Sequence, residues 1–179
     1  MPYDLSVPGN MLQEELEQIE YLASLVPENG NIVEIGSLFG RSAVAWAKSC
    51  HPSVNVYCVD MFHNIMENPS YSFYEEFLKH TQHIPNIIPI RAISPYIFET
   101  KLPDIQFDLV FLDAIHRNPF DIDNIRYFLP KIKSGGILCG HDYDPGWPDV
   151  VENVQLLEKE LGVSAQITPQ TTLWRFDIP

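Results

Sequence analysis

Apolar runs and amphipathic segments alternate along most of the chain. Residues 11–26 place apolar side chains at helical spacing and predict an amphipathic N-terminal helix. Short apolar runs after it predict buried strands at 32–35, 54–59, 87–90, 107–112 and 137–139. Further helices are predicted between and after these strands, at 41–49, 70–83, 94–100, 119–131 and 148–161. Pro169 and Gln170 predict a hairpin turn between two last strands, near 163–168 and 171–177.

Strands that are almost wholly apolar and alternate with helices are typical of a parallel sheet buried on both faces. The pattern predicts a doubly wound α/β fold, with a mostly parallel seven-stranded sheet and an antiparallel C-terminal hairpin. At 179 residues the chain is expected to form a single domain, 1–179. Gly135 and Gly136 are expected to turn the chain into its fifth strand.

Polar residues follow four of the predicted strands, although the strands themselves are apolar. They occupy the segments Glu34–Ser42, Asp60–Phe62, Asp113–His116 and His141–Tyr143. Ligands of doubly wound sheets bind beyond the carboxyl ends of the strands, where the strand order reverses. We therefore expect one functional site at this edge of the sheet.

The first strand runs into a glycine-containing turn, VEIGSLFGRS, at 33–42. Gly36 permits a sharp turn, Gly40 permits close approach of a ligand and the helix, and Ser42 offers a hydroxyl at the helix start. The segment lacks both the G-x-G-x-x-G fingerprint of dinucleotide-binding sheets and the G-K-[ST] phosphate loop. It therefore suits a nucleotide-like cofactor without a pyrophosphate, although a tight turn of any α/β protein has the same form.

Two acidic residues accompany this turn. Asp60 ends the second strand 24 positions after Gly36, where an acid can accept hydrogen bonds from both ribose hydroxyls; it could equally cap a helix. Glu34 lies within the first strand, where an unpartnered acid is costly to bury. A cationic ligand would supply such a partner.

Four segments together resemble class I S-adenosylmethionine-dependent methyltransferases, which have a Rossmann-like fold. E-I-G-S-x-x-G-R-S-A resembles their first motif, VYCVD the second strand, FDLVFLDAIH the fourth and GGILCGHDY the fifth. The likeness is greatest to the small-molecule O-methyltransferases of the catechol and caffeoyl-CoA type. It extends to a bacterial group of macrocin-type enzymes, methyltransferase family 24, and spans residues 12–176.

The resemblance implies the parts of the cofactor site. S-adenosylmethionine would be held by Gly36, Ser37 and Gly40 at its methionine part and by Asp60 at its ribose. The remaining implied cofactor-binding residues are Met61, Ala92 and Ile93 beside the adenine, Ser42 at the helix start, Asp113, and Glu34, which would hold the amino group indirectly.

The fourth and fifth strands are expected neighbours, so their ends should bring Asp113, His116, His141 and Asp142 together as the catalytic group. An imidazole there could take a proton from the acceptor directly. Alternatively, Asp113, His141 and Asp142 could hold a divalent cation that lowers the pKa of an acceptor hydroxyl. His141 stands where the related metal-dependent enzymes have an oxygen ligand, which favours manganese, iron or zinc over magnesium. His116 and Asp142 would otherwise be a helix cap and a turn acid.

Three aromatic residues follow the same strand ends. Phe62, Tyr143 and Trp147 could line an acceptor pocket, because aromatic side chains stack on planar or sugar substrates. Trp147 could instead pack beneath the loop before the last helix.

Composition narrows the partners and the compartment. Eleven basic residues against 24 acidic ones give a net charge of −13, which disfavours nucleic acid and anionic membrane surfaces. Three cysteines without a C-x-x-C pattern are expected to be buried free thiols in a reducing compartment. The start of the sequence has no signal-peptide pattern, and no run is long enough to span a membrane, so a cytoplasmic protein is expected.

These observations predict methyl transfer to a small-molecule acceptor, most readily a hydroxyl oxygen; an amine acceptor needs less help from a base. Two other classes stay open: a non-catalytic module that binds S-adenosylmethionine, and a nucleotide-dependent oxidoreductase on a related sheet. The sequence lacks the insertions that close the acceptor pocket in many methyltransferases, so a homodimer that completes the pocket is a further expectation.

Overall fold

A computed structural model of the protein describes residues 3–63, 72–101 and 104–179. In these ranges a sheet of seven strands has the order β3-β2-β1-β4-β5-β7-β6. The strands are β1 Asn31–Ile35, β2 Asn55–Asp60, β3 Ile87–Arg91, β4 Phe107–Leu112, β5 Ile132–Gly140, β6 Gln166–Ile167 and β7 Trp174–Asp177. The first five are parallel, and β7 runs antiparallel to both β5 and β6. This arrangement confirms the predicted fold class.

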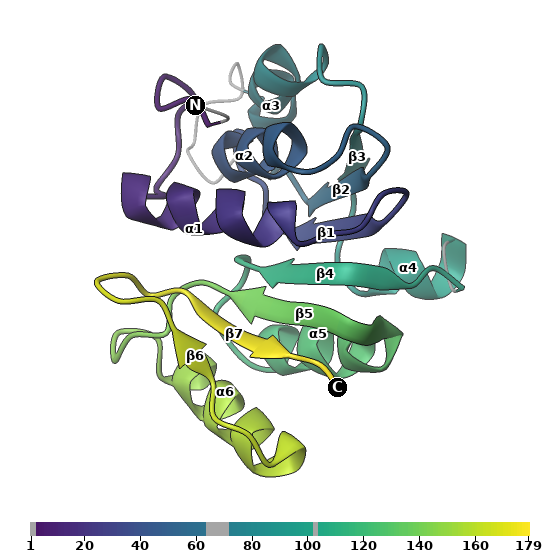
Figure 1. The fold of residues 1–179 in the computed structure, drawn as a ribbon. Helices are drawn as coiled ribbons and strands as arrows, with labels where there is room; N and C mark the ends of the chain where they lie inside the picture. Colours follow the sequence, from purple (N-terminus) through teal and green to yellow (C-terminus); the bar gives the residue numbers. More distant parts are fainter. Residues whose placement is uncertain (1–2, 64–71, 102–103) are drawn as a thin grey trace.

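Helices cover both faces of this sheet (Figure 1). They are α1 Gln13–Ser24, α2 Arg41–Ser49, α3 Phe73–Thr81, α4 Tyr96–Lys101, α5 Phe120–Phe128, the short 3-10 helix Leu129–Lys131, and α6 Pro148–Leu161. Helices α1 to α3 pack on one face and α4 to α6 on the other, and each face has its own apolar core. Within β1, Ile32 faces the α1–α3 core, whereas Val33 and Ile35 face the other, because successive side chains of a strand point to opposite faces.

Two predicted boundaries are wrong. Gly135 and Gly136 do not turn the chain into the fifth strand; they lie within β5, which begins at Ile132. The left-handed conformation of Gly135, with φ at +78°, accompanies a shift of register against β4 and forms a bulge. The C-terminal hairpin is also shorter than predicted: six residues, 168–173, separate β6 from β7 in place of a two-residue turn.

The other helices and strands begin and end within a few residues of their predicted positions. The N-terminal helix is shorter than 11–26, and its apolar face differs in one respect: Leu12 is 56% exposed, whereas Glu15 is buried. Ser72 caps α3 by accepting a hydrogen bond from the Glu75 amide; residues 70 and 71 of the predicted 70–83 helix lie outside the described ranges.

All three cysteines are buried free thiols, as expected. Among the described residues, no helix has the length and apolarity needed to cross a bilayer.

Backbone hydrogen bonds continue past the strand ends and hold the following loops side by side. Gly36 donates to the Val59 carbonyl at 2.8 Å, and Asp113 donates to the Ile35 carbonyl at 2.8 Å. In the same way, His141 donates to the Leu112 carbonyl at 3.0 Å. The carboxyl ends of β1, β2, β4 and β5 therefore meet at one edge, where the strand order reverses between β1 and β4.

Candidate active site

A cavity of about 620 Å³ opens at this edge of the sheet. Its volume lies within the usual range for small-molecule and cofactor sites. Most of the residues predicted for the cofactor and acceptor sites line it: Gly36, Ser37, Ser42, Asp60, Met61, Ala92, Ile93, Asp113, His116, His141 and Asp142. These residues therefore lie together around one cavity.

Gly36 has φ at +93°, a left-handed conformation that L side chains rarely adopt. A Cβ atom at this position would overlap the backbone oxygen of Asp113. Gly40 also has a positive φ, and a Cβ there would press on Thr81 and Phe77 of α3. Gly40 does not itself line the cavity, so its place in the site is to let the loop and α2 pack against α3.

Asp60 is bonded to the loop that follows β1. Its Oδ2 atom accepts hydrogen bonds from the amides of Ser37 at 3.0 Å and Leu38 at 2.9 Å. Its Oδ1 atom accepts one from the Phe62 amide at 2.7 Å. Because a carboxylate offers about four lone-pair positions, about one remains for a ribose hydroxyl, rather than the two that the sequence suggested. The same bonds fix the conformation of the loop.

Glu34 lies behind this loop and does not line the cavity. It is fully buried, and neither carboxylate oxygen has a hydrogen-bond partner in correct geometry among the described residues. Burial raises the pKa of Glu34 to about 7, a rise to which the charge of Asp60 adds, although the nearby Ser37 and Ser42 hydroxyls oppose it. Any influence of Glu34 on the cofactor thus passes through the two serines, which do line the cavity.

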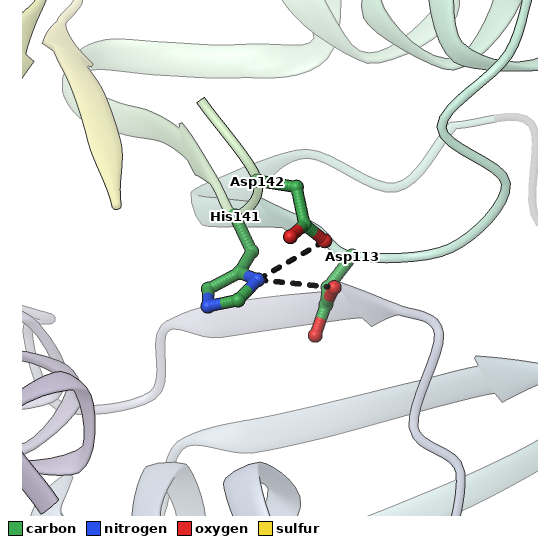
Figure 2. Close-up of side chains that lie close together, drawn as sticks. All are labelled: Asp113, His141 and Asp142. Carbon is green, nitrogen blue, oxygen red and sulfur yellow. Dashed lines mark ion pairs between the residues drawn. The ribbon is translucent and has the colours of Figure 1, made fainter. Parts of the chain in front are cut away.

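The predicted catalytic residues form one cluster. The Nδ1 atom of His141 faces the carboxylates of Asp113 and Asp142, at 3.8 Å and 3.1 Å respectively (Figure 2). His116 approaches the same carboxylates through its Nε2 atom, at 2.9 Å from Asp142 and 3.7 Å from Asp113. The four side chains come from the ends of β4 and β5, as the strand-end argument predicted.

A fifth member, Glu15, comes from α1 and was missed by the sequence analysis. Its Oε1 atom lies 2.9 Å from Nε2 of His141, and its Oε2 atom accepts a hydrogen bond from the Leu12 amide. Glu15 is only 3% exposed. By accepting a hydrogen bond from Nε2–H, it fixes the ring so that Nδ1 points to the aspartates. The sequence did contain a sign that Glu15 is buried. Ile19 and Leu22 follow it by four and seven positions, and residues at this spacing lie on the same face of a helix.

The cluster raises the pKa of both of its histidines. Burial alone would lower the pKa of His141, but hydrogen bonds to Asp142 and Glu15 raise that pKa to about 10. His116 also has a raised pKa, because its bond to Asp142 outweighs burial. The two imidazoles in turn hold the pKa of Asp142 well below its usual range. Asp113 differs, since burial raises its pKa to about 7. A cation that binds through Nδ1 of His141 must therefore displace a proton.

The three predicted aromatic residues have different surroundings. Trp147 lines the cavity with its ring centroid 4.8 Å from that of His116. Phe62 does not line it; its side chain is buried against Tyr74 and Phe77 in the core. Tyr143 packs at the edge of the α4–α6 core. Of the three, Trp147 alone lines the predicted acceptor pocket.

The segment before α1 forms a wall of the cavity that sequence reasoning also missed. Its residues 8–11 line the cavity, and Arg41 anchors the segment. The Arg41 guanidinium donates hydrogen bonds to the carbonyls of Val7 at 2.7 Å and Met11 at 2.8 Å. Further residues that were not predicted for the site also line the cavity, among them His63, Phe73, Ser94, Phe120 and Asn124.

Similar solved structures share the fold. An S-adenosylmethionine-dependent O-methyltransferase from Thermotoga maritima is 12% identical with a TM-score of 0.67, and the match covers 97% of this chain and 68% of that one. A TDP-rhamnose 3'-O-methyltransferase of calicheamicin biosynthesis is 18% identical with a TM-score of 0.64, covering 90% and 76%. A precorrin-8w decarboxylase from Methanobacterium thermoautotrophicum is 16% identical with a TM-score of 0.66, covering 98% and 96%. These proteins perform different reactions, so the fold leaves the acceptor open.

Family membership comes from the sequence. No curated protein matches the chain. A family model described as a methyltransferase domain matches residues 33–143, which are 111 of the 179 residues. The matched range includes the glycine turn, Asp60 and the four strand-end residues of the cluster, but not Glu15 of α1. The chain belongs to this methyltransferase family, and it is a class I S-adenosylmethionine-dependent methyltransferase.

Proposed function

We propose that the protein transfers the methyl group of S-adenosylmethionine to a hydroxyl oxygen of a small molecule. The observation that supports this proposal is that one cavity contains both the glycine turn with Asp60 and the cluster around His141. A cofactor held by the first group would present its reactive end to the second. Net charge and cavity size favour a small molecule over nucleic acid as the acceptor.

The cofactor contributes a methyl group on positively charged sulfur, which is already activated for displacement. The protein then has to align the acceptor with that group and assist the loss of the hydroxyl proton. In our proposal the amides of the 36–38 loop and the remaining acceptor position of Asp60 bind the cofactor. Asp113 and His116 face the acceptor side of the cavity, where Asp113 receives the proton and His116 orients the hydroxyl.

The same cluster fits a divalent cation. One ligand atom each from Asp113, His141 and Asp142 lies within 4.8 Å of the others, which is close enough for a shared ion. Two carboxylate oxygens and one imidazole nitrogen suit manganese, iron or zinc better than magnesium. Glu15 holds the far nitrogen of His141, a partner that metal-binding histidines commonly have. A cation held there would lower the pKa of the acceptor hydroxyl.

The experiment is a methyl-transfer assay on a panel of hydroxyl and amine acceptors, run with EDTA and with added manganese, iron or zinc. We expect methyl ethers as products. Asp142→Ala and His141→Ala should lower turnover by about 100-fold, the usual effect of losing acid–base assistance. Both variants should keep their affinity for S-adenosylhomocysteine, as measured by calorimetry.

The two modes of activation separate in this assay. Full turnover in EDTA assigns proton removal to the side chains alone, whereas turnover restored only by a metal assigns it to the cation. Cofactor binding without turnover on any acceptor would favour the non-catalytic alternative. If His141→Ala and Asp142→Ala both kept full turnover, the proposed activating cluster would be wrong.

A further inference from the structure

One arginine side chain holds the segment that precedes α1. Arg41 is the first residue of α2 and directly follows Gly40 of the glycine turn. Its guanidinium donates hydrogen bonds to three backbone carbonyls of the segment, those of Val7 at 2.7 Å, Met11 at 2.8 Å and Leu5 at 3.5 Å. The rigid fork of guanidinium donors can bind several carbonyls at once in fixed positions. The position of this segment therefore depends on the side chain that follows the glycine turn.

The peptide group between Met11 and Leu12 is hydrogen-bonded at both ends. Its oxygen accepts a bond from Arg41 at 2.8 Å, and its N–H donates one to Oε2 of Glu15 at 2.9 Å. Because a peptide group is planar, a bond that fixes its oxygen also fixes the direction of its N–H. The charge of the guanidinium also polarises the group and makes the N–H a stronger donor. Arg41 therefore acts on Glu15 through one peptide group.

Glu15 extends this series of bonds to the catalytic cluster. Its Oε1 atom lies 2.9 Å from Nε2 of His141, and Nδ1 of the same ring faces Asp142 at 3.1 Å. The two oxygens of a carboxylate are rigidly joined, so the bond from the Leu12 amide also sets the direction in which Oε1 meets the imidazole. Glu15 is buried and does not line the cavity, whereas Arg41 and His141 both do. The series thus connects two parts of the cavity wall without passing through the cavity.

We propose that Arg41 is a positioning residue for His141. It acts through the peptide group between Met11 and Leu12 and through Glu15. The proposal rests on the methyl transfer proposed above, in which the cluster around His141 activates the acceptor. Arg41 then links the glycine turn, which holds the cofactor, to the imidazole beside the acceptor. An arginine that only anchored the cavity wall would affect cofactor affinity, whereas a positioning residue also affects turnover.

Leu12 offers a substitution that breaks the series in the middle. Its backbone φ of −75° suits proline, and its side chain is 56% exposed. Leu12→Pro therefore removes the N–H that donates to Glu15 and leaves the side chains of Arg41 and Glu15 in place. Leu12→Ala is the matched control, because it removes the same exposed side chain and keeps the N–H.

The first measurement is kinetic and uses the best acceptor found in the methyl-transfer assay. Leu12→Pro should lower kcat about tenfold and leave the KM for S-adenosylmethionine unchanged, whereas Leu12→Ala should change neither. Arg41→Met should lower kcat to a similar extent and also raise that KM, because the segment it holds lines the cavity. Lys48→Met is its control, because Lys48 is an exposed cation in the last turn of the same helix. Equal kcat values for Leu12→Pro and Leu12→Ala would overturn the proposal.

A double-mutant cycle tests whether the effect passes through Glu15. In a Glu15→Leu background, Leu12→Pro and Arg41→Met should each lower kcat by less than about twofold further, because the side chain through which they act is gone. Losses that multiply in full would show that Arg41 acts by another route. If Leu12→Pro does not fold, the cycle between Arg41→Met and Glu15→Leu decides the question.

NMR of the imidazole gives a readout that does not depend on turnover. The Nε2 proton of His141, assigned by its absence in His141→Gln, should exchange slowly with water in the unmodified protein, because Glu15 accepts its hydrogen bond. At the same pH, this signal should be unchanged in Leu12→Ala and shifted or broadened in Leu12→Pro and Arg41→Met. An unchanged signal in Leu12→Pro, or no slowly exchanging proton in the unmodified protein, would contradict the proposal.

The two proposals fail in different ways. If no acceptor is methylated while the NMR signals change as expected, the proposed methyl transfer is wrong and the positioning of His141 stands. If an acceptor is methylated but Leu12→Pro matches Leu12→Ala in both kcat and the NMR signal, the positioning role of Arg41 is wrong. Calorimetry with S-adenosylhomocysteine shows which variants fold.

Discussion

Replacing Asp60 with asparagine changes its shape little but removes a charge and a hydrogen-bond acceptor. In the unmodified protein one carboxylate oxygen serves the amides of Ser37 and Leu38, and the other serves the amide of Phe62. The single oxygen of asparagine can replace only one of them, and its NH2 group would face an N–H group at the other. At least one bond to a charged acceptor is lost, at a cost of about 1.5–3 kcal/mol.

Two measurements should detect this loss. The Tm of Asp60→Asn should fall by about 3–12 °C, because 1 kcal/mol shifts the Tm of a domain of this size by about 2–4 °C. Affinity for S-adenosylhomocysteine should fall by about 10–100-fold, because the loop loses its fixed conformation and the ribose loses an acceptor. Calorimetry gives the affinity, and circular dichroism during heating gives the Tm.

Asp177→Asn is the matched control, since it removes the same charge from an exposed position on β7. It should leave the affinity for S-adenosylhomocysteine unchanged. If Asp60→Asn bound S-adenosylhomocysteine within twofold of the unmodified protein, Asp60 would be no part of the cofactor site. An unchanged Tm would show that its bonds to the loop contribute nothing to stability.

Substitutions at three further positions test other parts of the site. Gly36→Ala should abolish measurable cofactor binding, because a Cβ at this positive φ overlaps the backbone of Asp113; binding within tenfold would refute this. Burial raises the pKa of Glu34 from 4.5 to about 7. The free energy of unfolding should therefore fall as pH rises from 4.5 to 7, by on the order of 3 kcal/mol, because the folded protein resists ionisation of Glu34. Urea unfolding should therefore show Glu34→Gln gaining stability over the unmodified protein at pH 8 relative to pH 5; an equal difference at both pH values would contradict it. Glu15→Leu should lower kcat about 10–100-fold with the KM for cofactor unchanged, whereas Glu15→Gln keeps an oxygen for His141 and most of the activity; equal losses in both would argue against a positioning role.

The sequence predicted most of the fold because apolar periodicity alone distinguishes buried parallel strands from amphipathic helices. It failed where the backbone departs from that regularity. Gly135 and Gly136 were assigned to a turn, since glycine pairs are common there, but a strand bulge needs the same conformational freedom. Only pairing with β4 and β7 decides between the two.

The sequence predicted correctly which side chains meet at the strand ends, but not which ones join them from elsewhere in the chain. Asp113 and His141 could be found because parallel neighbours place their carboxyl ends together. Glu15 comes from a helix more than a hundred positions away, where an acid in the first turn has an ordinary capping explanation. Phe62 was assigned to the cavity from its place after β2, but its left-handed backbone, with φ at +48°, accompanies a side chain that lies in the core. Such turns are set by tertiary contacts that one sequence does not reveal.

A crystal structure with S-adenosylhomocysteine tests the central claim most directly, that one cavity holds the cofactor beside the catalytic cluster. We predict the ribose next to Asp60, the amino acid part along the 36–38 loop, and the sulfur directed toward Asp113 and His141. A ligand bound outside this cavity, or with its sulfur directed away from the cluster, would contradict the account.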